Sequence, residues 1–470
     1  MIRPVHKAAQ VRIYLQAPRA ENIPTVASAN HFSFLKEDID LDASIWALTA
    51  LSHYSWRSCT VIDLPIDLNY FVQMNANVPV IACAMRTPFG KYKGGLSQVR
   101  ADDLLASTIK QLLKKAPQLN PVDIDDVIIG DSNGAGEDNR NVARMGSLLA
   151  GLPVSVPGVT VNRLCGSSAE AMVLASRAVA AGEAKYIFAG GVESMSRAPW
   201  IVERLGDPAP ENPVFHQSTV GWRLTNPAMP TEWTQSLGKG AEDVAIEFAI
   251  SRQAQDEWAL RSHQLAARAW SDGLHDDWVY PYGQVNRDES IREDTSLEVL
   301  AGLKSAFSET GPLTAGNSSP LNDGSVLSLI TNLQGARDLN LEPIARIKSS
   351  RVVGVSPERF TTAPIYAIQK LLAANNLKAS DIDIWEINEA FAAMVLTVLS
   401  AFPEVSVSKV NVNGGAIAMG HPIGASASRA VIDCGRQLAR SGGRFGIAAA
   451  CIGVGQGIAL LLESTTAVGL

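Results

Sequence analysis

The sequence predicts an α/β protein built from two similar halves, and three observations lead to this prediction. From Met74 onward, strand-like runs of β-branched and apolar residues alternate with helix-like runs, the pattern of a wound α/β sheet. Two sequence patterns in the first part of this region return in the second part. Hydrophobic residues make up 46% of the 470 residues and charged residues 19%, which indicates a globular chain with a substantial core and argues against disorder.

The internal duplication involves two pairs of predicted strands. Residues 122–129 (VDIDDVII) are echoed by residues 380–387 (SDIDIWEI), and VTVN at 159–162 is echoed by VNVN at 410–413. The offset of about 250 to 260 residues is too long for a solenoid repeat and fits two similar halves packed face to face. Chance similarity between two βαβ units is the alternative explanation.

Residues 1–73 differ from the rest of the chain. Four basic residues and no acidic one occur in the first twenty, a weak resemblance to a transit peptide. Acidic residues follow, however, and no apolar segment or small-residue cleavage site appears. The first convincing strand, VPVIA at 78–82, comes just after Met74. We therefore expect residues 1–73 to be an extension outside the catalytic fold, with a targeting or accessory segment as the alternative.

Cys165 lies at a predicted junction between a strand and a helix. Residues 159–162 contain alternating β-branched residues, as in a short buried strand, and residues 167–181 place apolar residues along one helical face. Gly182 is suited to end that helix. Unpaired backbone N–H groups at a helix N-terminus favour a thiolate, so we expect this sulfur to be more nucleophilic than a free cysteine. The alternative is a small buried apolar residue.

A region of different character, about residues 198–325, lies between the two halves. Six of the nine tryptophans fall there, among many polar and turn residues, and only residues 241–269 are strongly helical in pattern. We expect an inserted lobe, because substrate-binding loops commonly lie on a rigid scaffold. The chain returns to the sheet at 313–324 (LTAGNSSPLNDG).

Three loops of the second half carry polar groups directly after predicted strands. They contain Asn388 in NEAF, His421 in GHPIG and Cys451 in CIGVGQG. This is the edge at which open α/β sheets bind ligands. The glycines and proline around His421 favour a placed functional group over a structural histidine, the alternative. Residues 445–462 are interpreted as two short buried strands around a glycine turn, with a membrane helix as the alternative.

Composition argues against several classes of protein. The net charge is −7 without a basic block, so neither a nucleic acid nor an anionic membrane is an expected partner, and no membrane span is expected. The five cysteines are scattered and never in CxxC spacing, which predicts free thiols in a reducing compartment. We therefore expect a cytoplasmic protein without a disulfide framework. No metal-ligand spacing appears, so no metal site is expected.

These residues resemble the thiolase family. Six motifs in the order of the family carry the resemblance over residues 78–463, namely VNRLCGSS (161–168), GGVESMS (190–196), TAGNSSPLNDG (314–324), NEAF (388–391), GGAIAMGHPIGAS (414–426) and CIGVGQG (451–457). The resemblance implies a thiolase-like fold with two duplicated βαβαβ halves in a layered αβαβα arrangement. It also implies a loop domain that holds coenzyme A. The expected assembly is a homodimer or homotetramer. The expected domains are 74–340, which includes the loop domain, and 341–470.

The resemblance implies a role for each of four side chains. Cys165 matches the cysteine that becomes acylated, and Cys451 matches the second cysteine, which moves the proton at the substrate α-carbon. His421 matches the histidine that activates the nucleophile and donates to the thioester oxygen. Asn388 matches the asparagine that holds the water of that oxyanion hole.

The resemblance also implies ligand contacts. The backbone N–H groups of Cys165 and Gly453 match a second oxyanion hole. Coenzyme A is then a co-substrate together with acyl-CoA, and no cofactor is bound permanently. The coenzyme A contacts that the resemblance implies are Ser319 and Ala315 at the pantetheine, Phe391 in the tunnel wall and Arg292 near the nucleotide.

The implied reaction is thiolytic cleavage of a 3-oxoacyl-CoA to acyl-CoA and acetyl-CoA, reversible as a Claisen condensation, with a general role in fatty acid β-oxidation and lipid metabolism. Its ping-pong course needs a soft nucleophile, stabilisation of an enolate and an acid for the leaving carbon. Residues 136–145 (GEDNRNVARM) and 220–223 (VGWR) resemble thiolases acting on 3-oxoadipyl-CoA in aromatic catabolism, which is one alternative. A biosynthetic acetoacetyl-CoA thiolase is another.

Three other classes of protein are weighed against a thiolase. A ketoacyl synthase shares the fold but has no acid–base cysteine, so Cys451 separates the two. A non-catalytic acyl-CoA-binding homologue would be expected to lack at least one of the four groups. A Cys–His hydrolase would need a positioned water. One departure from the family pattern, SLGKGAE at 236–242 where many members carry His-Met before glycine, leaves the acyl chain-length preference open.

Overall fold

The computed structural model describes residues 9–14, 61–66, 77–204 and 212–465. The chain separates into two compact units, Met1–Asn75 and Ala76–Leu470. In the first unit, strand β1 (Ala9–Tyr14) pairs antiparallel with β2 (Val61–Ile66). Most of the predicted extension, residues 1–73, lies outside the described residues, so its role remains a prediction.

The second unit is organised around a mixed ten-stranded sheet. β5 runs parallel to β6 and β7, whereas β10 runs antiparallel to β3 and β7. Most of these strands are buried over nearly their whole length, as expected when helices cover both faces of a sheet. In spatial order, the first half of the sheet consists of β3 (Pro79–Arg86), β10 (Asn322–Asn332), β7 (Ile187–Ser194), β5 (Asp126–Gly130) and β6 (Val159–Val161), with β4 (Gly90–Lys91) beside β10.

The second half of the sheet repeats the order and directions of the first. β12 runs parallel to β13, and β14 runs antiparallel to β13 and β11. The two halves are joined where β3 pairs with β11, which makes one continuous sheet. The prediction included only the packing of the two halves face to face. In spatial order this half consists of β11 (Ala345–Gly354), β14 (Gln456–Glu463), β13 (Phe445–Ile452) and β12 (Ile384–Ile387).

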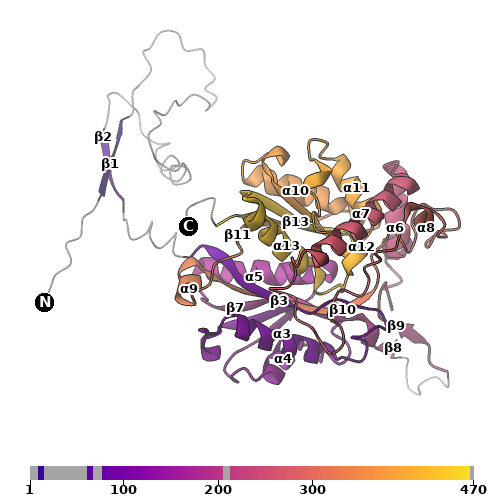
Figure 1. Cartoon of the computed structure of the whole chain (residues 1–470), viewed down its shortest axis with the longest axis horizontal. Helices are drawn as coiled ribbons and strands as arrows, with labels where there is room; N and C mark the ends of the chain where they lie inside the picture. Colours follow the sequence, from indigo (N-terminus) through magenta and orange to yellow (C-terminus); the bar gives the residue numbers. More distant parts are fainter. Residues whose placement is uncertain (1–8, 15–60, 67–76, 205–211, 466–470) are drawn as a thin grey trace, which may run out of the picture. The chain divides into compact units, whose positions relative to one another are not determined.

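Helices complete five layers, and Figure 1 shows this unit in the order helix, sheet, helix, sheet, helix. Helices α5 and α13 lie between the two halves of the sheet and contact each other. The contact includes a hydrogen bond from the Ser428 N–H to Ser168 Oγ at 2.9 Å. The layered arrangement implied by the sequence is therefore confirmed. The outer layers are α3 (Ala101–Lys115) with α4 (Val142–Ala150) and α10 (Ala363–Ala374) with α11 (Ala392–Ser400), and the central layer is α5 (Ser167–Ala181) with α13 (Ser426–Ser441).

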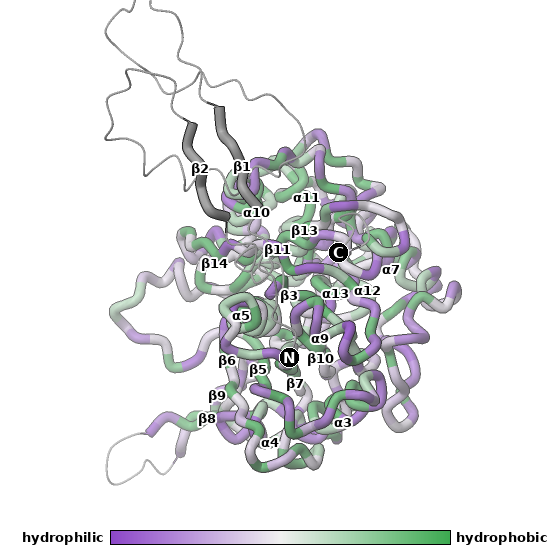
Figure 2. Tube along the Cα trace, turned by 90° about the vertical axis from the view of Figure 1, so that its left-hand side faces the viewer, coloured by the Kyte–Doolittle hydropathy of each residue, from purple (hydrophilic) through white to green (hydrophobic). Residues whose placement is uncertain are grey.

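Three buried apolar clusters hold these layers together. One joins α3 and α4 to the first half of the sheet, a second surrounds α5 and α13, and a third joins α10 and α11 to the second half. Figure 2 shows the apolar residues running through the strands and central helices of this unit, with hydrophilic residues on many of the connecting loops. Because α5 and α13 are apolar on the faces that point to the two halves of the sheet, they are core helices and not surface helices.

Several predicted elements are confirmed. The helix after Cys165 spans Ser167–Ala181, and Gly182 ends it with a left-handed φ of 75°. Residues 445–462 form the hairpin β13–β14 with a turn at 453–455, as expected from their glycines. Within the described ranges, no helix is both long and apolar enough to cross a membrane.

Two predictions about local structure are wrong, and a third region is helical as predicted but divided into two helices. VTVN at 159–162 forms β6, but Val159 is 43% exposed because β6 is an edge strand and not a buried one. Its echo at 410–413 makes only isolated bridges, one of them parallel between Val410 and Trp385. Residues 241–269 contain two helices, because Ala249 takes a φ of +53° and Ser251 begins a new helix by capping the N–H of residue 254.

The region predicted as a lobe, about residues 198–325, contains helices and short strands, and its two longest helices pack on the second half. α6 and α7 contact α11, and α7 also contacts the short helix α12 (Ala416–Met419). Its described elements are the hairpin β8 (Trp200–Val202) and β9 (Phe215–Gln217), the 3-10 helix η5 (Thr231–Thr234), α6 (Leu237–Glu247), α7 (Arg252–Ser271), α8 (Leu297–Ala301) and the start of β10.

Candidate active site

Cys165 lies in a one-turn 3-10 helix, Leu164–Gly166, that leads into α5. Leu164 has a φ of +47°, a strained conformation for a residue with a side chain and one that is common at functional sites. Gly166 packs against the end of β13, where a Cβ would lie 2.6 Å from Ile452 Cδ1. The residue after Cys165 is therefore packed closely against β13, the strand that carries Cys451.

The environment of the Cys165 thiol opposes its ionisation. Burial raises its pKa to about 11, although hydrogen bonds from the backbone N–H groups of Gly453 and Cys165 itself favour the thiolate. The expectation that the helix N-terminus favours the thiolate of Cys165 is therefore wrong for its pKa, because desolvation raises the pKa more than these donors lower it. A thiolate needs a base that takes its proton.

Cys451 occupies the end of β13 and is completely buried. Burial holds its pKa well above the ordinary range, and negative charge on Cys165 raises this pKa further. The two thiols are thus close enough to influence each other, although they come from different halves of the chain. A charge on one group that shifts the pKa of the other is expected when two titratable groups lie close together.

His421 is fixed in place by its neighbours. Gly420 has a φ of 113°, and a Cβ there would lie 2.4 Å from Asn322 Cγ; Asn322 Oδ1 accepts the His421 N–H at 3.0 Å. The imidazole Nδ1 lies 2.5 Å from Ser426 Oγ and 3.5 Å from Asn388 Nδ2. His421 Nε2 and Asn388 Oδ1 are buried without a hydrogen-bond partner among the described residues. Both atoms are therefore available to hydrogen-bond a ligand or a water molecule.

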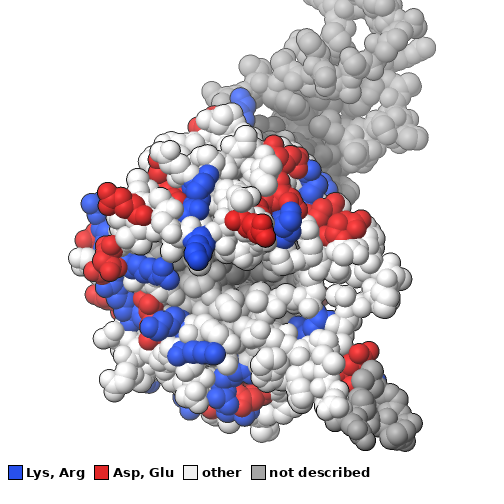
Figure 3. All heavy atoms as spheres, turned by 90° about the vertical axis from the view of Figure 1, so that its right-hand side faces the viewer, with Lys and Arg blue, Asp and Glu red and all other residues white. Residues whose placement is uncertain are grey.

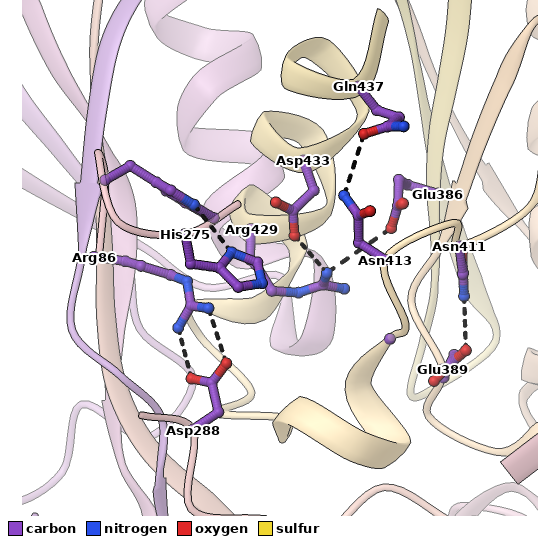
Figure 4. Close-up of polar contacts among 12 residues, drawn as sticks. Arg86, His275, Asp288, Glu386, Glu389, Asn411, Asn413, Arg429, Asp433 and Gln437 are labelled. Carbon is purple, nitrogen blue, oxygen red and sulfur yellow. Dashed lines mark hydrogen bonds and ion pairs between the residues drawn. The ribbon is translucent and has the colours of Figure 1, made fainter. Parts of the chain in front are cut away.

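The His421 imidazole is neutral at physiological pH. Burial lowers its pKa to about 4, and the nearby Arg429 guanidinium lowers it as well. Arg429 interacts with two carboxylates, as drawn in Figure 4. Its Nη1 lies 2.8 Å from Asp433 and 3.8 Å from Glu386, and all three side chains are buried. A neutral imidazole can take up a proton, which the charged form cannot do.

Glu389 ties together the loops that carry Asn388 and His421. Its carboxylate, buried beside Asn411 in Figure 4, accepts four hydrogen bonds from different segments. Each of these four contacts is a donor, so both oxygens of the Glu389 carboxyl group act as acceptors. The four donors are Trp258 Nε1 (2.9 Å), Ser262 Oγ (2.6 Å), Asn411 Nδ2 (2.9 Å) and the Ile417 N–H (3.1 Å).

Replacing Glu389 by glutamine is expected to lower the free energy of unfolding by about 3 kcal/mol, because the new amide N–H₂ would face donors and leave buried groups unpaired. Urea denaturation measures this loss. The exposed Glu342→Gln variant is the matched control and should unfold like the wild type. Equal stability of the two variants would show that the four hydrogen bonds contribute little.

Glu193 connects three further segments of the site. Its Oε2 accepts the N–H of Ser132 at 3.0 Å, the hydroxyl of Ser132 at 2.5 Å and the N–H of Gly424 at 2.8 Å. Burial raises its pKa to about 7, against the effect of these hydrogen bonds. The carboxyl group thus joins the loop after β5, the end of β7 and the loop that follows His421.

A pocket of about 440 Å³, including its open mouth, adjoins Cys165. The 218–223 segment of the lobe, the loop after β5 and the loops around Leu164, Ile423 and Gly453 line it. Arg223 is the only charged residue of the lining. One face of the molecule, drawn in Figure 3, also shows an uncharged recess with basic and acidic side chains around it.

The four residues predicted to bind coenzyme A lie outside the lining of this pocket. Phe391 is buried, and the Ser319 N–H donates to the backbone carbonyl just before it. Ala315 and Arg292 are exposed, and the Arg292 N–H donates to His263 Nδ1 at 3.1 Å. Their contacts with coenzyme A remain predictions.

Three residues of this region have no role among the sequence-based predictions. Ser426 lies five residues after His421, a spacing that gives no helical or strand-like signal. Glu193 is a lone acid near the end of an apolar strand, which is a usable signal for a placed charge. Arg223 was noted only as part of the VGWR pattern.

The arrangement combines the groups needed for acyl transfer to carbon. It has two buried thiols close together, a neutral imidazole and an amide, together with backbone N–H groups directed at the Cys165 sulfur. Among the described residues, no group of three or more His, Cys, Asp or Glu side chains could hold a metal ion.

Comparison with known proteins agrees with this chemistry. The thiolase N-terminal domain profile matches residues 79–333, and the thiolase C-terminal domain profile matches residues 341–464. The chain is 45% identical over 395 residues to a 3-oxoadipyl-CoA/3-oxo-5,6-dehydrosuberyl-CoA thiolase of Escherichia coli strain K12, an alignment covering 82% of this chain and 98% of that one. It is also 45% identical over 394 residues to a beta-ketoadipyl-CoA thiolase of Acinetobacter baylyi, with the same coverage.

A solved structure shares the fold. The crystal structure of the Bacillus anthracis acetyl-CoA acetyltransferase is 36% identical to the chain, covers 83% of it and 99% of its own length, and superposes with a TM-score of 0.76. A probable acetyl-CoA acyltransferase of Staphylococcus aureus strain COL is 39% identical over 398 residues, which is 82% of this chain and 98% of that protein.

Proposed function

The chain belongs to the thiolase family and is an acyltransferase that uses acyl-CoA and coenzyme A, and we propose that its preferred substrate is 3-oxoadipyl-CoA. The products would be succinyl-CoA and acetyl-CoA. This substrate is favoured over a general 3-oxoacyl-CoA of β-oxidation because several relatives at 43–45% identity are named beta-ketoadipyl-CoA thiolase.

In the proposed first half-reaction, His421 Nε2 takes the proton of Cys165, and the thiolate attacks the C3 ketone carbon. The bond between C2 and C3 breaks, and its electron pair passes to the thioester as an enolate. Nε2–H and a water held by Asn388 donate to the enolate oxygen. Cys451 then gives its proton to C2, which releases acetyl-CoA and leaves the acyl group on Cys165.

In the second half-reaction, the thiolate of Cys451 takes the proton of free coenzyme A. The coenzyme A sulfur attacks the acyl-Cys165 carbonyl, whose oxyanion is stabilised by the N–H groups of Cys165 and Gly453. Collapse expels the Cys165 sulfur, which recovers its proton from His421. The Ser426 hydroxyl can donate to or accept from Nδ1, so it suits both protonation states of the ring.

The observation that carries this mechanism is that Cys165 and Cys451, which come from different halves of the chain, lie close together, with backbone N–H groups directed at the Cys165 sulfur. Negative charge on Cys165 raises the pKa of Cys451, which supports a second cysteine that stays protonated until the carbanion forms. The unpaired Nε2 of His421 beside Asn388 supports a site for the enolate oxygen.

A coenzyme-A-dependent cleavage assay with acetoacetyl-CoA, longer 3-oxoacyl-CoA thioesters and 3-oxoadipyl-CoA tests the substrate. We expect the highest kcat/KM with 3-oxoadipyl-CoA, and parallel lines in double-reciprocal plots as in ping-pong kinetics. A preference for acetoacetyl-CoA would instead support the biosynthetic alternative, and a preference for long chains would support a role in β-oxidation.

Two further properties belong to the proposal. We expect a homodimer or homotetramer, as implied by the family resemblance, which sedimentation analysis can measure. We also expect a cytoplasmic location, because the four described cysteines are free and buried. Residues 1–73 leave organellar targeting as the alternative, which imaging of the full chain can distinguish.

A further inference from the structure

We infer that Arg223 selects substrates whose acyl chain ends in a carboxylate, by binding that carboxylate in the pocket beside Cys165. This inference rests on the proposed function and assigns a structural basis to it. Arg223 and Cys165 line the same pocket, and the rest of the lining is uncharged. An acyl group attached to the Cys165 sulfur therefore has one cation within the same cavity.

The Arg223 guanidinium has donors to spare. Its one hydrogen bond within the described part of the chain goes from Nη2 to Asn133 Oδ1 at 3.2 Å, and no carboxylate there forms a salt bridge with it. A guanidinium has five N–H donors in a planar fork that matches a carboxylate. Arg223 is half-buried, so an unpaired charge there is only partly solvated. An anionic ligand group would complete its hydrogen bonding.

Asn133 holds the guanidinium in position. Its Nδ2 donates to the backbone carbonyl of Ser218 at 3.3 Å and lies 3.2 Å from Ser218 Oγ. The Ser218 hydroxyl in turn donates to the carbonyl of Pro199 at 2.5 Å. These bonds turn Asn133 Oδ1 toward Arg223, so the fork is oriented before any ligand arrives. Such preorganisation lowers the entropic cost of binding.

The apolar walls of the pocket strengthen this selection. Trp222, Leu237 and Ile423 line the same space as Arg223. A methyl-terminated chain would shield the guanidinium from water without giving it a partner, which costs free energy. A succinyl group, with two methylenes between its thioester and its carboxylate, would bring a charge that pairs with it. The pocket therefore discriminates by the end group rather than by chain length alone.

Kinetics on two substrates of equal length test this inference. 3-Oxoadipyl-CoA and 3-oxohexanoyl-CoA differ only in the terminal carboxylate. Arg223→Gln is expected to lower kcat/KM for 3-oxoadipyl-CoA about 10- to 100-fold, the effect of one charge-assisted hydrogen-bonded pair, and to leave 3-oxohexanoyl-CoA little changed. Arg223→Lys should fall between, because it keeps the charge and loses the fork.

A matched control separates local binding from net charge. Lys185→Gln removes one positive charge from the surface, where Lys185 pairs with Asp338. Lys185 lies just before β7, at the end of the strand opposite to Glu193. This variant should leave both substrates unaffected. Acylation of Cys165, followed by intact mass, gives a second readout: Arg223→Gln should slow acylation by succinyl-CoA and not by butyryl-CoA.

The outcomes distinguish the two proposals. If the wild type prefers 3-oxoadipyl-CoA and Arg223→Gln keeps that preference, the proposed substrate stands and the role of Arg223 is wrong. Equal losses on both substrates would also overturn it, because they would indicate a general effect on the site. A wild type without any preference for 3-oxoadipyl-CoA would overturn the proposed substrate, and unchanged succinyl-CoA acylation in Arg223→Gln would then overturn the inference as well.

Discussion

Replacing Cys165 by serine is expected to abolish acyl-enzyme formation and to lower turnover by roughly 10⁴-fold or more, as in other enzymes that lose their nucleophile. A hydroxyl in this pocket is even harder to ionise than the thiol, whose pKa burial already raises to about 11. Incubation with acyl-CoA should add the mass of one acyl group to the wild type and none to the variant.

Cys83→Ala is the matched control for this experiment. Cys83 is also buried, and burial raises its pKa to about 12, but it lies in β3 outside the pocket lining. This variant should still be acylated. An acyl group on Cys165→Ser that is passed on to coenzyme A would assign the nucleophile to another residue.

Replacing Cys451 by alanine is expected to separate the two halves of the chemistry. Cys165 should still accept an acyl group from acyl-CoA, whereas exchange of the α-protons of acetyl-CoA with deuterated solvent should be lost. Turnover should fall about 10²- to 10⁴-fold, the usual contribution of a general acid–base group. NMR of the acetyl methyl signal in D₂O measures the exchange.

Cys434→Ala provides a control with a second buried thiol, in α13, that is not proposed to take part in the reaction. It should exchange like the wild type. Full exchange in Cys451→Ala would mean that another group moves this proton, and His421 would be the next residue to test.

Helices and strands can be predicted from the sequence where a local residue, such as a glycine, marks the end of the element. The helix after Cys165 was predicted to the residue, because small apolar residues fill it and Gly182 takes the left-handed conformation at its end. The β13–β14 hairpin was likewise predicted from its glycines. Exposure of Val159 could not be predicted, because it depends on β6 lying at the edge of the sheet.

In the candidate site, too, features within one loop could be predicted from the sequence, whereas features that depend on distant segments could not. Six motifs were enough to predict roles for four side chains, since each of them occurs in a distinctive loop. The pKa of Cys165 was predicted in the wrong direction, because desolvation depends on residues that pack over the thiol from the other half. The four donors to Glu389 could not be foreseen, as they come from segments far apart in the chain.

The central position of α5 has a consequence for the synthesis of this chain on the ribosome. Its apolar surface is covered on one side by α13, which begins at Ser426, long after α5 ends at Ala181. At 5 to 20 residues per second, the nascent chain leaves that surface uncovered for roughly 10 to 50 s. We therefore expect the emerging first half to depend on chaperones that shield hydrophobic surface until translation is complete.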